Sequence, residues 1–195
     1  MNRRETEKLD KEVEKAARVI MKGGTILYPT DTIWGIGSDA TRIKPVKKVF
    51  RIKKRDESKS LIILVDKVER LEKHSRFYSE LVYDLVKGFD KPTTIIYPGA
   101  KNLAKNVIAR DGTVAIRVVN HAFCKQLIAR LDRPIVSTSA NLAGEPPPSV
   151  FSEITENIRS QVDYVVEWEQ NTVREVKPST ILKLKENGMY EVIRS

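Results

Sequence analysis

The ten residues from Tyr28 to Gly37, YPTDTIWGIG, follow an apolar run with two threonines, an aspartate and two glycines. Hydroxyl and carboxylate groups can bind a polar ligand, and glycines let a backbone approach one closely. Gly35, Gly37 and Ala40 also match the dinucleotide-binding pattern GxGxxG/A by letter. In that pattern the first glycine ends a strand directly and the last position opens a helix, whereas here a loop intervenes and Pro45 places the helix later. We therefore reject a Rossmann site and expect a different use for these residues.

A strongly basic stretch follows, with nine basic and two acidic residues between Arg42 and Lys59, which give it a local net charge of +7. Lys53 continues the apolar row of a predicted helix, so its ammonium should point toward the body of the protein, where it requires an anion. Two interpretations stay open. The charges can form a solvated stripe along which the stem of Lys53 lies, or the end of the helix can form a polyphosphate cradle. The cradle would consist of Lys53, Lys54, Arg55 and Lys59.

Two later segments bring polar side chains to predicted strands. Residues 137–139 end a strand in three hydroxyls and are followed by Asn141 and Gly144, and short polar side chains at the carboxyl end of a strand are placed to bind a ligand. Thr113 and Arg117 lie on the same face of another strand, because side chains alternate between the faces with a period of two. Taken singly, each cluster can also have a purely structural role, since hydroxyls cap turns.

The elements that must position these residues indicate an α/β fold with a mixed sheet, because predicted strands alternate with helices and a hairpin ends the chain. We expect helices over 6–22, from Pro45 onward, up to Gly88, after a cap at Asn120, and over 150–158. Asp66 and Glu69 predict a further helix cap, and residues 139–149 predict an irregular loop. We interpret residues 1–195 as one domain. The expected strands are 25–28, 60–65, 93–97, 113–119, 135–138, 162–167, 180–185 and 189–193, with a turn at Glu186-Asn187-Gly188.

The composition is ordinary for a soluble globular protein, with 41% hydrophobic and 31% charged residues. No apolar run approaches the roughly 20 residues of a membrane-spanning helix, and the charged start has no apolar signal core, so we expect a cytoplasmic protein. The net charge of +9 favours polyanionic partners such as nucleotides or RNA. The single cysteine, Cys124, and the distant His74 and His121 have no metal-ligand spacing, so we predict no protein-bound metal.

In this order, the motifs resemble those of the YrdC-like family, the threonylcarbamoyl-AMP synthases of transfer-RNA modification. Residues 28–37 are similar to the family's signature, commonly Tyr-Pro-Thr-Glu-Thr-x-Tyr-Gly-Leu-Gly, and Lys53-Lys54-Arg55 is similar to its Lys-x-Arg motif. Residues 113–117 and Ser139-Ala140-Asn141 with Gly144 resemble its later motifs. The resemblance covers about residues 10–195. It implies a twisted open α/β sheet with flanking helices around a large basic concave cavity.

The resemblance also implies an activity. Family members condense L-threonine, bicarbonate or carbon dioxide, and ATP into threonylcarbamoyl-adenylate and release pyrophosphate. ATP is a substrate and is expected to bring Mg²⁺ with it. Partner proteins, the tRNA threonylcarbamoyl-transferases, then modify the adenosine at position 37 of tRNA. This chemistry needs positioned substrates and neutralised charge, and no side-chain nucleophile.

Carried over position by position, the resemblance implies two groups of site residues. Lys53 and Arg55 would act electrostatically on the reacting phosphates. The sequence departs from the family pattern at four positions. Trp34 stands where the family commonly has tyrosine, Asp31 where it has glutamate, Asp56 where it often has proline, and Leu64 where some members have histidine. Threonine would be held by Thr30, Arg117, Ser137 and Ser179. ATP would be held by Lys53, Arg55, Lys59, Thr113, Ser139, Asn141, Pro147 and Arg194.

Two alternatives remain. The chain could be a non-catalytic module that binds double-stranded RNA or tRNA through the basic stripe, with an affinity that falls steeply with salt and does not require Thr30 or Ser139. It could also be a paralogue of the same fold with a different carbamoyl or acyl substrate. Thr32, Gly35 and the intact Ser139-Ala140-Asn141 motif favour the synthase.

Overall fold

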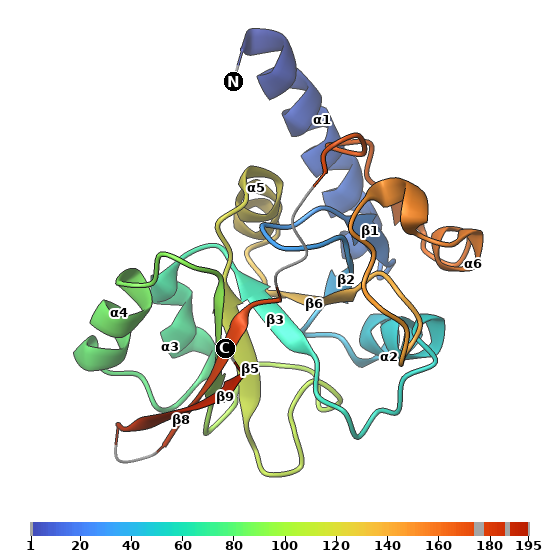
Figure 1. The fold of residues 1–195 in the computed structure, drawn as a ribbon. Helices are drawn as coiled ribbons and strands as arrows, with labels where there is room; N and C mark the ends of the chain where they lie inside the picture. Colours follow the sequence, from blue (N-terminus) through green and yellow to red (C-terminus); the bar gives the residue numbers. More distant parts are fainter. Residues whose placement is uncertain (1, 174–177, 186–187, 195) are drawn as a thin grey trace.

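The structure is a computed structural model that describes residues 2–173, 178–185 and 188–194. Its described strands form one nine-stranded sheet in the order β7-β1-β2-β6-β3-β5-β4-β8-β9 (Figure 1). The β1–β7, β3–β5 and β4–β8 pairs are parallel, and the other neighbours are antiparallel. The predicted mixed α/β class is therefore confirmed. The strands are β1 (Ile26–Tyr28), β2 (Gly35–Asp39), β3 (Ile62–Val65), β4 (Thr93–Tyr97), β5 (Val114–Val118), β6 (Ile135–Ser139), β7 (Tyr164–Val165), β8 (Thr180–Leu184) and β9 (Tyr190–Arg194).

Helices cover both faces of the sheet and define two hydrophobic cores. On one face, α1 (Arg3–Met21) and α5 (Ala122–Leu131) pack over the strand residues Ile26, Leu64 and Ile135. The second core lies on the opposite face of the sheet. It contains the next residues along the same strands, such as Leu27 and Val136, because successive side chains of a strand point to opposite faces. The remaining helices pack on this face. Those elements are α2 (Ile43–Ile52), η1 (Val68–Arg70), α3 (Leu71–His74), α4 (Glu80–Lys87), η2 (Phe151–Glu153) and α6 (Glu156–Arg159).

Strand β2 is the main departure from the sequence prediction, which placed a loop there. Gly35–Asp39 pairs with β1 on one side and with β6 on the other. A Cβ atom at Gly37 would lie 2.6 Å from the carbonyl oxygen of Val136 and 2.7 Å from Cε1 of Tyr28. Real Cβ atoms do not approach other atoms so closely. The glycine therefore allows the Tyr28 ring and β6 to pack directly against the backbone of β2, and it does not bind a dinucleotide.

Two predicted helix caps are wrong. η1 follows Lys67 without a side-chain cap, because the carboxylate of Asp66 accepts a hydrogen bond from Nε of Arg70 instead. α5 likewise begins after His121 without a side-chain cap, and Oδ1 of Asn120 accepts a hydrogen bond from Nζ of Lys125 at 2.9 Å. In both places a basic side chain competes for the predicted capping group.

Some predicted bounds also differ. The helix predicted over 150–158 is broken into η2 and α6, and the helix ending near Gly88 begins only at Glu80, after the Ser79 hydroxyl that caps it. The strand predicted over 162–167 is reduced to β7. In the predicted turn Glu186-Asn187-Gly188, residues 186 and 187 lie outside the described residues, while Gly188 has a φ of 83°.

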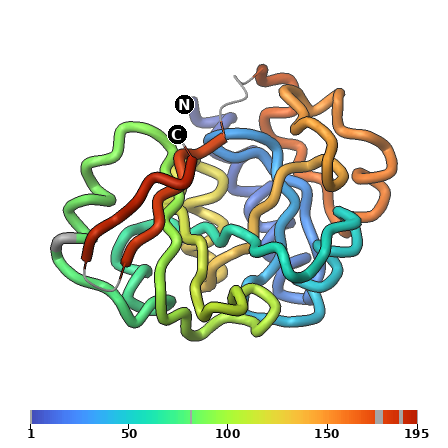
Figure 2. Tube along the Cα trace, turned by 60° about the horizontal axis from the view of Figure 1, so that its bottom comes forward, coloured from blue at the N-terminus to red at the C-terminus, as the bar shows by residue number. Residues whose placement is uncertain are grey.

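The C-terminal hairpin β8–β9 and the segment from 140 to 172 lie on opposite sides of the molecule, as the two views in Figures 1 and 2 show. β8 pairs with β4, whereas residues 139–143 adjoin the end of α2 through a hydrogen bond from Ala143 N to Lys53 O of 2.9 Å. Among the described residues, no helix is long and apolar enough to cross a membrane.

Candidate active site

A cavity of about 480 Å³ lies over the middle of the sheet, on the face that carries α1 and α5. Ile62, Ala115 and Ser137 form its floor and are neighbours in register across β3, β5 and β6. Segments far apart in the chain close it, from the β1–β2 connection to the C-terminal hairpin. Of the residues predicted to form the site, the cavity is lined by Thr30, Arg55, Arg117, Ser137, Ser139, Pro147, Ser179 and Arg194.

One side of the cavity, which we call the Arg117 wall, consists of Thr30, Thr32 and Arg117. The Thr30 hydroxyl donates to the Ile33 carbonyl at 2.7 Å and accepts from Thr32 N at 3.1 Å. Its single proton is therefore in use, so toward a ligand it can act only as an acceptor, in place of its contact with the Thr32 hydroxyl. Nη1 of Arg117 donates to the Thr32 hydroxyl at 3.1 Å. The two threonine hydroxyls are themselves 3.0 Å apart, so this wall is a connected polar network.

Arg117 is buried, with 5% of its surface exposed, and its charge is paired. Nη2 lies 3.1 Å from Oδ1 of Asp31, and the other oxygen of Asp31 accepts a hydrogen bond from Asn120 N at 3.0 Å. Among the described residues, Nε of Arg117 has no hydrogen-bond partner. The guanidinium thus keeps N–H groups for a ligand, that of Nε among them, and sequence reasoning missed the carboxylate that faces it.

A second hydroxyl pair adjoins this wall. The Ser179 hydroxyl is 2.8 Å from that of Thr94, and the Ser179 carbonyl accepts a hydrogen bond from Nη2 of Arg194 at 2.8 Å. Thr94 stands opposite Arg117 across the β4–β5 pair. Sequence reasoning did not select Thr94, because only the order of the strands in the sheet brings it beside Ser179.

Another side of the cavity is lined by Ser139 and Pro147, and Lys53 and Asn141 support it from outside the lining; we call these four residues the Lys53 wall. Lys53 is 2% exposed, as predicted from its place in the apolar row of α2. Its ammonium donates to the carbonyls of Ser139 and Asn141, both at 2.6 Å. Burial, together with the nearby charge of Arg55, lowers the pKa of Lys53 to about 8. The group that this lysine binds is therefore a pair of backbone carbonyls of its own chain.

Arg55 projects from the turn after α2 and is half-buried at the edge of the cavity. Its Nη2 donates to the Ser60 carbonyl at 2.9 Å, and burial lowers its pKa. Among the described residues, its Nε has no hydrogen-bond partner. Arg55 thus faces the cavity with an N–H to spare, in contrast to Lys53.

Four of the predicted site residues are not part of the lining. Lys53 and Asn141 lie behind Ser139, and Lys59 is exposed on the loop after α2. The Thr113 hydroxyl donates to Asp111 at 2.7 Å, just before β5 begins. The large basic cavity that the resemblance implies stays a prediction, since one of the three lining arginines is paired with Asp31.

Trp34 forms an apolar part of the lining where the family commonly has tyrosine. It is buried and packs on Phe151 with a centroid separation of 4.9 Å and an interplanar angle of 51°. Its carbonyl accepts a hydrogen bond from Ala140 N at 3.0 Å. Trp34 therefore connects the β1–β2 hairpin to the start of the loop after β6.

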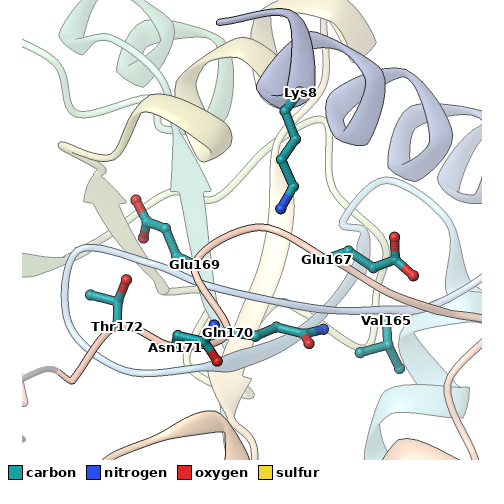
Figure 3. Close-up of a pocket in the computed structure, with 7 residues that line it drawn as sticks. All are labelled: Lys8, Val165, Glu167, Glu169, Gln170, Asn171 and Thr172. Carbon is teal, nitrogen blue, oxygen red and sulfur yellow. The ribbon is translucent and has the colours of Figure 1, made fainter. Parts of the chain in front are cut away.

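A separate cavity of about 510 Å³ lies between α1 and the segment after β7. Figure 3 shows Lys8 pointing from α1 toward this segment, with Glu167 and Glu169 at its rim. None of the predicted site residues is part of its described lining. Its two carboxylates would repel an anionic substrate, so its slightly larger volume does not make it the better candidate.

Comparison with known proteins places these motifs in a family. The model of the Sua5/YciO/YrdC family, described as "Telomere recombination", matches residues 18–195. The threonylcarbamoyl-AMP synthase of Pseudoalteromonas translucida is 30% identical over 172 residues, which are 87% of this chain and 91% of that protein. The threonylcarbamoyl-AMP synthase of Stutzerimonas stutzeri is 34% identical over 157 residues, 80% of this chain and 84% of that protein.

A solved structure is also similar. The crystal structure of Pyrococcus abyssi Sua5 complexed with L-threonine has a TM-score of 0.80 and 28% sequence identity. The match covers 88% of this chain and 50% of that one, so this chain spans about half the length of the P. abyssi protein. The twisted mixed sheet with flanking helices is thus shared with that protein.

Proposed function

The chain belongs to the Sua5/YciO/YrdC family, and from this premise we propose that it is a threonylcarbamoyl-AMP synthase of transfer-RNA modification. Relatives that carry this name and match most of their own length support a nucleotidyltransferase-like enzyme. The observation that carries the proposal is that two arginines line different parts of one cavity, Arg117 among buried hydroxyls and Arg55 at the edge. One anionic substrate can bind at each.

In the proposed reaction, the amine of L-threonine attacks the carbon of carbon dioxide and loses a proton, or attacks that of bicarbonate with loss of water, and gives a carbamate. A carbamate oxygen then attacks the α-phosphorus of ATP, the bond to the β-phosphate oxygen breaks, and pyrophosphate leaves. The Arg117 wall would hold threonine, with Nε of Arg117 donating to its carboxylate and the Thr30 hydroxyl accepting from its amine or hydroxyl. Ser137 and Ser179 would complete this half of the site.

The nucleotide would lie along Arg55, Ser139, Pro147 and Arg194, so that the α-phosphate meets the carbamate near the middle of the cavity. Lys53, Lys59, Thr113 and Asn141 are assigned to ATP through the family resemblance. Protein groups here would supply position and positive charge, which are the main requirements of phosphoryl and nucleotidyl transfer.

The Mg²⁺ expected with ATP is treated as part of the substrate. Within the part of the chain that the structure describes, no three His, Cys, Asp or Glu side chains form a group that could hold a metal ion. The phosphates themselves are the natural ligands of this ion, and the protein residues named above would bind the oxygens that the ion leaves open.

The experiment that tests the proposal measures pyrophosphate release with ATP, bicarbonate and a panel of L-threonine, L-serine and L-valine. We expect release to require bicarbonate and to be fastest with L-threonine, since serine lacks the methyl group and valine the hydroxyl. Omission of bicarbonate is the control for ATP hydrolysis. If L-threonine gives no more release than L-serine, or none at all, the proposed substrate is wrong.

The proposal extends to the partners. The adenylate would pass to tRNA threonylcarbamoyl-transferase proteins, which act on tRNA.

A non-catalytic RNA-binding role would use the exposed basic residues of α2, such as Lys44, Lys47 and Arg51, and would show salt-dependent RNA binding without pyrophosphate release. The single domain over residues 1–195 and the cytoplasmic location stay predictions.

A further inference from the structure

Lys53 stands at the C-terminal end of α2, where its side chain and backbone both meet the segment after β6. In addition to the two carbonyls at 2.6 Å, Nζ lies 3.2 Å from Oγ of Ser139 and 3.2 Å from Oδ1 of Asn141. The Lys53 carbonyl accepts a hydrogen bond from Ala143 N at 2.9 Å. The end of α2 is thus attached to three residues of one short segment.

The ammonium has no proton left for a phosphate. A lysine carries three N–H donors, and here two point at the carbonyls while the third is shared by the Ser139 hydroxyl and the Asn141 amide oxygen. Lys53 is almost fully buried and is not part of the described lining of the cavity. A direct bond to ATP would require it to give up at least one of these bonds and to move from its buried position, which is costly when buried groups lose their partners.

The segment that Lys53 binds also has hydrogen bonds of its own. Nδ2 of Asn141 donates to the carbonyl of Glu145 at 2.6 Å, and Leu142 N donates to the Glu145 carboxylate at 3.1 Å. These contacts close a turn over residues 141–145, and Pro147, just after it, lines the cavity. Ser139, just before it, also lines the cavity. The position of both lining residues therefore depends on the point where Lys53 fixes the chain between them.

We propose that Lys53 is a positioning residue, which holds residues 139–147 in place as the nucleotide side of the cavity, while Arg55 keeps the contact with phosphate that the proposed function already gives it. This changes the role that the family resemblance implies for Lys53. The nucleotide part rests on the proposed function, whereas the attachment of the segment to Lys53 does not.

The first test compares amide hydrogen exchange of residues 139–145, the part of the segment before its prolines, without ligand, in the wild type, Lys53→Met and the matched variant Arg55→Met. We expect exchange in this segment to be roughly tenfold faster or more in Lys53→Met, since opening no longer breaks the bonds to Nζ. Exchange in the same segment of Arg55→Met should match the wild type, because Arg55 donates to Ser60 instead. Unchanged exchange in Lys53→Met overturns the proposal.

The second test measures the affinities of the same three proteins for AMP, ADP and ATP. A positioning role predicts that Lys53→Met weakens all three nucleotides by a similar factor. Arg55→Met should lose more affinity with each added phosphate, because a direct ionic contact is lost. A loss in Lys53→Met that grows from AMP to ATP as steeply as in Arg55→Met contradicts the proposal.

These two tests separate the inference from the proposed function. A wild-type protein that binds no nucleotide contradicts the function and leaves the exchange test valid. If Lys53→Met does not fold, Lys53→Gln is used for the same comparison; its side chain is shorter, neutral and has two N–H donors instead of three, so exchange in the segment should still be faster than in the wild type, by a smaller factor. Faster exchange that extends equally over β3 and β5 would make Lys53 a general core residue and overturn the positioning role.

Discussion

The two walls of the cavity bury their cations in different ways. In the Arg117 wall, a guanidinium fixed on a central strand is paired with the carboxylate of Asp31 and with the Thr32 hydroxyl. In the Lys53 wall, an ammonium is surrounded by neutral groups of a single loop, and its pKa is lowered to about 8 by burial and by Arg55. The first wall is fixed by several sheet elements, whereas the second depends on one side chain. Under the proposed function, threonine would meet a preformed surface, and the nucleotide side would be the adjustable one.

The largest expected effect is on the Arg117 wall. Arg117→Met removes one partner of a buried ion pair and leaves the Asp31 carboxylate uncompensated, which typically costs about 3–5 kcal/mol. We expect a loss of that order in the free energy of unfolding, measured with urea. Arg55→Met, at the open edge of the cavity, should change it by less than about 1 kcal/mol.

The double variant Arg117→Met/Asp31→Asn is the control for this reading. It removes both charges, so it should recover a substantial part of the lost stability. A single variant Arg117→Met that is as stable as the wild type would show that the ion pair is not what fixes this wall, and the contrast with the Lys53 wall would disappear.

The next effect concerns the strand pairing beneath the Arg117 wall. In Gly37→Ala the added Cβ would meet the Val136 carbonyl at 2.6 Å, and forcing a methyl group into a packed region typically costs about 1–3 kcal/mol. We expect a lower unfolding temperature and weaker pairing of β2 with β6. Gly88→Ala is the matched control, because its Cβ would find only ordinary contacts at 3.5 Å. Equal stability of the two variants would mean that β2 and β6 can separate freely.

Local periodicity was enough to predict much of this arrangement. The apolar row of α2 predicted that the Lys53 side chain points toward the body of the protein, and it is buried. The alternation along the strand predicted that Thr113 and Arg117 share one face; Arg117 lines the cavity, but Thr113 lies just before β5 and its hydroxyl donates to Asp111 instead. These predictions depend only on helix and strand geometry within one segment. The same reasoning predicted that Lys53 meets an anion, but its partners are carbonyls, which carry no signal in the sequence.

The contacts that sequence reasoning missed are long-range. Asp31 reaches Arg117 and Asn120, and Thr94 reaches Ser179, only because of the order of strands in the sheet. Nothing local in the sequence specifies that order. Strand β2 was missed for another reason: its two glycines are typical of a loop, and the Tyr28 ring that leaves no room for a Cβ atom at Gly37 lies on the neighbouring strand.

The smallest expected effect is on ligand affinity, and it shows whether Asp31 and a bound carboxylate compete for the guanidinium of Arg117. Asp31→Asn keeps the shape of the side chain and an oxygen for Asn120 N, but it removes the negative charge that neutralises the guanidinium. If Arg117 binds the carboxylate of L-threonine, the affinity for L-threonine should rise about fivefold, or about 1 kcal/mol, because the ligand no longer competes with a like charge. Threoninamide, which has no carboxylate, is the control and should bind both proteins equally. A weaker affinity for both ligands would instead make Asp31 the partner of their ammonium group, and the Arg117 wall would then recognise both charges of the amino acid.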